Sequence, residues 1–230
     1  VRAGVELNLL GALTEMRLKM RAQWIHSKKS KRDRKFDDGG FWGLLEHEYG
    51  EDISDEEWKR TWARADSALT WWFESDFRRL IEETPPAKWL ATDPERGEKL
   101  VSFPVLPGVP SFGAPDFALE TAEGKVLILD WKTGARKAAD IDQILNYAAL
   151  LQHKHKLDPE RMLGQLVYLR EQDWLDVPVT QGELDDFRGR VAADVALMRS
   201  KLADPEKNVP LPVEAFKQTS VASKCARCYF

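Results

Sequence analysis

Cysteines and long apolar runs are what this chain has least of. Its 230 residues include 2 cysteines, which excludes a secreted scaffold held by disulfides and leads us to expect a reducing, cytoplasmic setting. No apolar stretch approaches the roughly 20 residues that a membrane-spanning helix needs, and no secretory signal opens the chain. The formal net charge of -4 excludes a uniformly basic coat, so a polyanionic partner would be bound through local patches.

The length of the chain fits one α/β domain with a helical elaboration. Ser54 and Glu57 have the spacing of a capping box, which predicts a long helix that runs to about Glu83, just before a pair of prolines. We therefore expect an N-terminal helical region over residues 1–88. An α/β core with a C-terminal helix and a Cys-x-x-Cys tail is expected over residues 89–230.

Strand patterns begin in the second of these regions. Residues 126–132 are mostly apolar and include β-branched side chains, which predicts a strand. Because side chains alternate between faces, Asp130 and Lys132 share one face with apolar residues earlier in the strand. Residues 112–119 predict a second strand, and the proline-punctuated residues 104–110 predict a connector that leads into it.

A short loop between these two strands decides whether their carboxylates meet. Residues 122–124 suit a three-residue hairpin loop with glycine in a left-handed conformation, so we expect Thr121 to pair with Lys125. That register places Asp116 directly opposite Asp130. A slip of one residue would send the two carboxylates to opposite faces of the sheet.

A helix is predicted over residues 140–156, with Asp140 as its N-cap. Gln143 and Tyr147 are four residues apart and therefore neighbours on one face of that helix. An apolar stripe would seat the helix on the sheet, so that Gln143 and Tyr147 look towards the carboxylates. The stripe consists of Ile141, Ile144, Leu145, Ala148 and Leu151.

The rest of the core continues the alternation of strands and helices. Residues 161–170 predict a strand, and residues 177–180 predict its hairpin partner. Thr180 and Glu183 have capping-box spacing and open a helix that is expected to reach Leu202. Together these elements predict a mixed sheet flanked by helices.

The five polar residues of this region suit one kind of chemistry. Facing carboxylates repel each other, so Asp116 and Asp130 need a cation between them, and hard oxygen ligands favour Mg²⁺ or Mn²⁺. Lys132 would orient or help to deprotonate a water and stabilise negative charge, as cleavage of a phosphodiester requires. The alternative is a surface ion pair at a strand end beside a helix whose Gln143 and Tyr147 are only decorative. Five residues in the right order on the right elements favour the site.

These motifs together carry a family resemblance. Asp116 after a proline, Asp130-Trp-Lys132 and Gln143-x-x-x-Tyr147 resemble the PD-(D/E)XK nuclease superfamily, in particular its RecB/AddB-type branch. The resemblance implies a restriction-endonuclease-like mixed central sheet flanked by helices. It also implies that Asp116 and Asp130 bind the metal, that Lys132 is the catalytic lysine, and that Gln143 and Tyr147 form an auxiliary motif.

The function implied by this resemblance is metal-dependent hydrolysis of DNA, exonuclease-like, in repair, recombination or defence. The implied partners are single-stranded DNA or duplex ends and a helicase or other protein subunit. The alternative is a catalytically silent nuclease-like module that binds DNA or scaffolds a larger complex, although the intact Asp116, Asp130 and Lys132 count against it. The basic run at residues 28–35 is either a solvated loop or a segment that binds the phosphates of a nucleic acid.

The same branch implies a histidine on an early helix, in a Gly-x-x-x-His context, as a further metal ligand. Gly43 and His47 have that spacing, and His26 is a second candidate. Because the chain begins at Val1 rather than at Met, we expect a fragment of a longer protein, and the histidine ligand could then precede Val1.

The branch also implies an iron–sulfur cluster. Cys225 and Cys228 form a Cys-x-x-Cys pair near the C-terminus, of the kind that helps to hold a [4Fe–4S] cluster in this branch. Such a cluster needs four ligands, so two cysteines suffice only if further cysteines lie outside these 230 residues. A zinc site would lack two ligands for the same reason.

Overall fold

The computed structural model describes residues 8–29, 43–50, 52–92, 101–217 and 220–221. These residues form two compact units. The first comprises the described residues up to Leu80 together with residues 169–172, and the second comprises the others, from Ile81 onwards. None of the helices in the described ranges has the length and apolar character that crossing a bilayer requires.

The first unit is helical. Its helices are α1 (Leu9–Ser27), α2 (Leu45–Tyr49), α3 (Asp55–Glu74) and the start of α4 (Asp76–Glu83). The rings of Trp24 on α1 and Trp58 on α3 lie 4.3 Å apart, and Arg17 on α1 forms an ion pair with Asp66 on α3. The two long helices thus pack through an aromatic contact and an ion pair.

The capping box predicted for the first unit is confirmed. The Ser54 hydroxyl accepts a hydrogen bond from the Glu57 N–H at 3.2 Å, and the Glu57 carboxylate accepts one from the Ser54 N–H at 3.0 Å. The prediction that this helix continues to Glu83 is wrong, because the chain becomes extended at Ser75 and a new helix begins at Asp76. The Ser75 hydroxyl donates to the Trp72 carbonyl at 2.7 Å, so a side-chain hydrogen bond takes part in ending α3.

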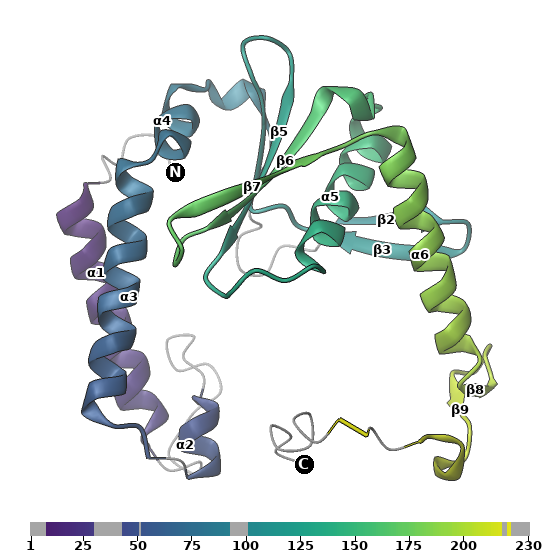
Figure 1. Ribbon diagram of the computed structural model, residues 1–230, viewed down its shortest axis with the longest axis horizontal. Helices are drawn as coiled ribbons and strands as arrows, with labels where there is room; N and C mark the ends of the chain where they lie inside the picture. Colours follow the sequence, from purple (N-terminus) through teal and green to yellow (C-terminus); the bar gives the residue numbers. More distant parts are fainter. Residues whose placement is uncertain (1–7, 30–42, 51, 93–100, 218–219, 222–230) are drawn as a thin grey trace. The chain divides into compact units, whose positions relative to one another are not determined.

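The second unit is built around a five-stranded mixed sheet (Figure 1). The strands are β1 (Trp89–Thr92), β4 (Phe117–Glu120), β5 (Val126–Lys132), β6 (Met162–Tyr168) and β7 (Asp173–Pro178), and they lie in the order β1-β4-β5-β6-β7. The pair β5 and β6 is parallel, and the other three pairs are antiparallel. The predicted mixed sheet flanked by helices is confirmed.

The predicted register of the β4–β5 hairpin is also confirmed. Phe117 pairs with Leu129 and Glu120 with Val126, and the Thr121 N–H donates to the Lys125 carbonyl at 2.8 Å. Gly124 adopts the expected left-handed conformation, with φ at 76°. The hairpin loop therefore sets the register that the sequence predicts.

Two predictions upstream of this hairpin are wrong. Residues 112–119 are not one strand, because residues 114–116 separate β3 (Val109–Gly113) from β4. Residues 104–110 are not a plain connector either, because β2 (Val101–Leu106) and β3 form an antiparallel hairpin in which Pro104 lies opposite Pro110. A two-stranded sheet tolerates these prolines, since each strand has an edge on which a missing N–H removes no ladder bond.

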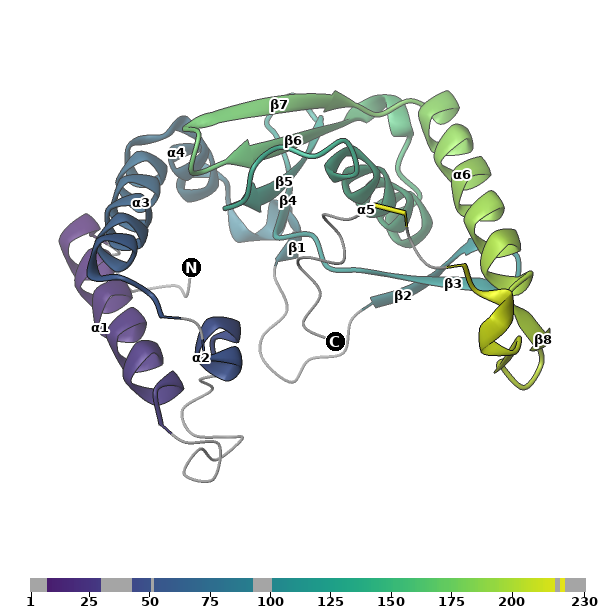
Figure 2. The ribbon, with the colours of Figure 1, turned by 60° about the horizontal axis from the view of Figure 1, so that its bottom comes forward.

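Helix α5 (Asp140–His155) lies between the five-stranded sheet and the β2–β3 hairpin (Figure 2). Most of its predicted apolar stripe is fully buried, but Ile141 is 37% exposed, contrary to expectation. The helix comes closest to the sheet at Gly164 on β6, where an added Cβ would lie 2.1 Å from Cγ2 of Ile144. Glycine at position 164 therefore sets how deeply α5 packs.

Helix α6 (Gln181–Arg199) begins where predicted but ends sooner. The Thr180 hydroxyl accepts a hydrogen bond from the Glu183 N–H at 3.1 Å. Instead of extending the helix, Leu202 belongs to β8 (Leu202–Asp204), which pairs with β9 (Val209–Pro210). Short 3-10 turns occur at Pro86–Lys88, Pro159–Arg161 and Val213–Ala215.

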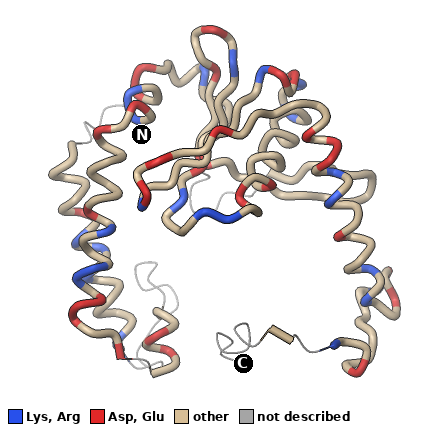
Figure 3. The backbone as a smooth tube through the Cα atoms, in the orientation of Figure 1, with Lys and Arg blue, Asp and Glu red and all other residues tan. Residues whose placement is uncertain are grey.

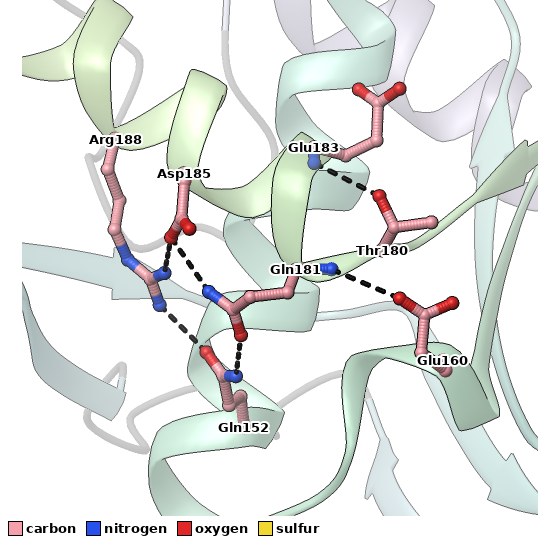
Figure 4. A network of polar contacts seen from close by, with 7 residues as sticks. All are labelled: Gln152, Glu160, Thr180, Gln181, Glu183, Asp185 and Arg188. Carbon is pink, nitrogen blue, oxygen red and sulfur yellow. Dashed lines mark hydrogen bonds and ion pairs between the residues drawn. The ribbon is translucent and has the colours of Figure 1, made fainter.

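A ring of polar side chains joins α6 to α5 (Figure 4). Arg188 donates to Gln152 at 2.8 Å, Gln152 donates to Gln181 at 3.0 Å, and both Gln181 and Arg188 donate to Asp185, at 2.7 and 3.0 Å. These hydrogen bonds lie beside the apolar contact of the two helices. They join α6 to Gln152, near the C-terminal end of the helix that also carries Gln143 and Tyr147.

We expect Gly164→Ala to destabilise the protein by about 1–3 kcal/mol, because the new methyl group would overlap the side chain of Ile144. Gly189→Ala on α6 is the matched control, since its Cβ would meet nothing within 4 Å and alanine favours a helix. Urea unfolding of both variants measures the difference. Equal free energies of unfolding for the two variants would show that α5 and β6 can move apart without a loss of stability.

Candidate active site

The site forms at the C-terminal end of β5, where a charged residue follows an apolar run. Asp130 is 1% exposed and lies on the same strand face as the buried Val126 and Ile128. Its Oδ2 atom lies 2.6 Å from Nζ of Lys132, yet no donor among the described residues meets hydrogen-bond geometry at that oxygen. The contact is therefore an ion pair rather than a well-directed hydrogen bond. Burial raises the pKa of the Asp130 carboxyl, while the ammonium of Lys132 opposes that rise.

Asp116 reaches the same end of β5 from the neighbouring strand. It immediately precedes β4, whose first residue, Phe117, pairs with Leu129, the residue before Asp130. Its Oδ2 atom accepts a hydrogen bond of 2.7 Å from the N–H of Trp131, the residue after Asp130. The two carboxylates predicted to act together thus both lie at this strand end.

Lys132, Gln143 and Tyr147 form one chain of hydrogen bonds. Nζ of Lys132 donates to Oε1 of Gln143 at 2.5 Å, and Nε2 of Gln143 donates to the Tyr147 hydroxyl at 2.5 Å. Tyr147 is 6% exposed, whereas the side chain of Lys132 is 20% exposed. The structure therefore connects Asp130 to the auxiliary pair through the lysine, which keeps some access to solvent.

The donor set fits a hard divalent cation. Asp130 offers a buried carboxylate that is paired with Lys132, and Asp116 offers a second carboxylate at the same strand end. No cluster of three or more His, Cys, Asp or Glu side chains suited to a metal occurs among the described residues. Mg²⁺ commonly uses one or two carboxylates and completes its shell with water and substrate phosphate, so two protein ligands are enough.

The other predicted ligands lie in the first unit or outside the described residues. His47 and His26 lie in the first unit, where Nδ1 of His47 is 2.8 Å from the Ser27 hydroxyl and His26 is 5% exposed. Their role as metal ligands stays a prediction. Cys225 and Cys228 lie outside the described residues, as do positions 30–35 of the basic run.

Residues that the sequence motifs did not single out surround the start of α5. Asp140 was predicted to be the N-cap, but Ala139 holds that position and Asp140 is the first helical residue. The Asp140 carboxylate instead accepts hydrogen bonds from the Lys137 N–H and the Tyr168 hydroxyl, each at 3.0 Å. Tyr168 pairs with Lys132 in the parallel register of β5 and β6, and only knowledge of that pairing could have revealed its place.

The raised pKa of Asp130 makes a prediction about stability. The folded metal-free protein holds this proton more tightly than the unfolded chain, so the carboxyl's contribution to stability falls as pH rises above 3.8, its ordinary pKa. At neutral pH we therefore expect Asp130→Asn to raise the melting temperature of the metal-free protein. Thermal unfolding in chelator checks this, with Asp176→Asn on β7 as the control. A lower melting temperature for Asp130→Asn would mean that the pair with Lys132 outweighs the cost of burial.

Comparison with known proteins agrees with this geometry. The chain matches the PD-(D/E)XK nuclease superfamily over residues 34–230, a span that includes all five site residues. A search of curated proteins found no match. The match covers most of the chain, and the paired carboxylates and lysine lie together at one strand end. The chain therefore belongs to the PD-(D/E)XK nuclease superfamily.

Proposed function

We propose that this protein is a Mg²⁺- or Mn²⁺-dependent deoxyribonuclease of the RecB/AddB type. The observation that carries the proposal is the buried Asp130 carboxylate, which lies 2.6 Å from the Lys132 ammonium at the strand end that Asp116 also reaches. Membership of the superfamily supports nuclease activity. The hydrogen bonds that join Lys132, Gln143 and Tyr147 support the finer assignment, because they join the Gln-x-x-x-Tyr pair to the lysine.

Each side chain has a defined part in this proposal. Asp116 and Asp130 hold the cation, which, when bound, polarises the scissile phosphate and lowers the pKa of a coordinated water. Lys132 orients the attacking water and stabilises negative charge that develops on the phosphate. Gln143 accepts from the Lys132 ammonium and fixes its direction, and Tyr147 in turn orients the Gln143 amide.

The wider role follows from the resemblance to the RecB/AddB branch. We infer that the substrate is single-stranded DNA or a duplex end, cut exonuclease-like in repair, recombination or defence, in the cytoplasm. Acidic and basic residues are interspersed along the described chain (Figure 3), so phosphates would be bound by local groups rather than by a uniform basic coat. A helicase or other subunit, and a [4Fe–4S] cluster that uses Cys225 and Cys228 with further cysteines, belong to the same proposal. We also propose that the chain divides at residue 88 into an N-terminal helical region and the nuclease core.

Asp116→Ala and Asp130→Ala should each lower metal-dependent cleavage by roughly a hundredfold or more, because each removes a ligand from a site that has two. Both variants should stay folded, since removing one carboxylate relieves repulsion in the metal-free protein. The assay is cleavage of end-labelled single- and double-stranded DNA with Mg²⁺, Mn²⁺ or chelator. Asp176→Ala, at a carboxylate that accepts from Gln165, is the control. Wild-type rates in either ligand variant would refute the site.

Lys132→Ala should keep Mn²⁺ binding but lose roughly 10²–10⁴-fold in turnover, the range typical of a lost acid–base group. Calorimetry measures the binding, and the labelled-DNA assay measures the turnover. Lys125→Ala, an exposed lysine just before β5, is the matched control and should leave turnover unchanged. Unchanged turnover in Lys132→Ala would remove the lysine from the mechanism. No cleavage by folded wild-type protein with either metal would favour a silent DNA-binding or scaffold module.

A further inference from the structure

A buried tyrosine lies next to the candidate lysine but outside every sequence motif. Tyr168 is the last residue of β6 and is 1% exposed. It pairs with Lys132 on β5 and with Asp173 on β7. Its backbone is therefore fixed by strands on both sides, at the edge of the sheet where the site forms.

The Tyr168 hydroxyl reaches from the sheet to the first residue of α5. It donates to Oδ2 of Asp140 at 3.0 Å, and the same oxygen accepts from the Lys137 N–H at 3.0 Å. One carboxylate oxygen thus joins the end of β6, the start of α5 and the loop between β5 and α5. A carboxylate oxygen has the lone pairs to accept both hydrogen bonds.

A second contact ties the same loop to the same tyrosine. The guanidinium of Arg136 lies 4.8 Å from the centre of the Tyr168 ring, and it forms an ion pair with Asp173. Residues 133–139 are all exposed to solvent. The segment that leads from Lys132 to α5 is therefore held at two consecutive residues, Arg136 and Lys137.

We propose that Tyr168 and Asp140 are positioning residues that fix the start of α5 so that Gln143 meets the Lys132 ammonium. Asp140 and Gln143 are three residues apart on one helix, so they face the same side, and a shift of Asp140 moves Gln143 with it. Gln143 accepts the hydrogen bond of the Lys132 ammonium, so the position of the start of α5 decides whether this bond forms. This inference rests on the proposed function, because it assigns the contact a part in catalysis.

The experiment uses variants that change hydrogen bonds and little else. Tyr168→Phe removes the hydroxyl but keeps the ring beneath Arg136. Asp140→Ala removes the acceptor, whereas Asp140→Asn keeps a carbonyl oxygen that can accept both hydrogen bonds. Asp142→Asn is the matched control, because Asp142 lies two residues further along α5 and pairs with Arg190 on α6 instead.

Steady-state cleavage of labelled DNA, well below the melting temperature, measures kcat and KM. We expect kcat to fall about tenfold in Tyr168→Phe and Asp140→Ala, in keeping with the roughly hundredfold that a displacement of 1 Å costs at other active sites. KM should change less than about twofold, because no contact with DNA is removed. Asp140→Asn and Asp142→Asn should keep turnover near that of the wild type.

A double variant tests whether Tyr168 acts through Gln143. In the Gln143→Ala background, Tyr168→Phe should lower kcat by less than about twofold, because the contact that it positions is already lost. A full tenfold loss in that background would overturn the proposed route. A wild-type kcat in Tyr168→Phe alone would also overturn it. Equal losses of kcat in Asp140→Ala and Asp140→Asn would do the same.

Amide hydrogen exchange separates this inference from the proposed function. Tyr168→Phe should accelerate exchange at the Lys137 amide and in the first turn of α5, and leave the last turn of α5 unchanged. Unchanged exchange at Lys137 would overturn the tether, whatever the activity. If the wild-type protein cuts no DNA, the nuclease proposal fails, and the exchange rates alone decide whether Tyr168 holds the start of α5.

Discussion

The buried carboxylate of Asp130 is the constraint on which the rest of the site depends. An ionised group with 1% exposure at the end of an apolar strand is costly unless a cation meets it. Lys132 meets it in the structure, two residues further along the same face, and Asp116 accepts a hydrogen bond from the N–H of the next residue, Trp131. Each of these placements follows from strand alternation once the register is fixed. Strand alternation and register therefore fix the positions of the polar side chains at the end of β5 as they fix those of its apolar side chains.

The parallel pair β5 and β6, with α5 between them in sequence, supplies the other half of the site. Both strands end at the same edge of the sheet, and α5 starts there, so its first turns come to lie beside Lys132. Gly164 lets the helix sit deeply enough for Ile144 to be fully buried. The position of Gln143 is thus set by packing below it and by hydrogen bonds at the start of the helix.

The sequence allowed the local parts of this arrangement to be predicted, since they depend on period and turn chemistry. Gly124 signalled the hairpin loop, alternation placed Asp130 with Lys132, and a spacing of four joined Gln143 to Tyr147. What failed or was missed depends on contacts that the sequence does not display. A hydrogen bond from Ser75 divides a helix whose pattern appeared continuous, and Tyr168 reaches Asp140 only because two distant strands are neighbours. The interruption before β4 likewise appears only when β3 is seen to pair with β2.

The ion pair between Lys132 and Asp130 also bears on the order of folding and metal binding. In many small metal sites the ligands repel until the ion arrives, so binding energy becomes folding energy and chelation unfolds the protein. Here Lys132 already pairs with the buried Asp130 carboxylate, at 2.6 Å. The charge at the end of β5 is therefore balanced by a side chain of the protein itself. Under the proposed function, removal of the metal would therefore lower cleavage without unfolding the protein.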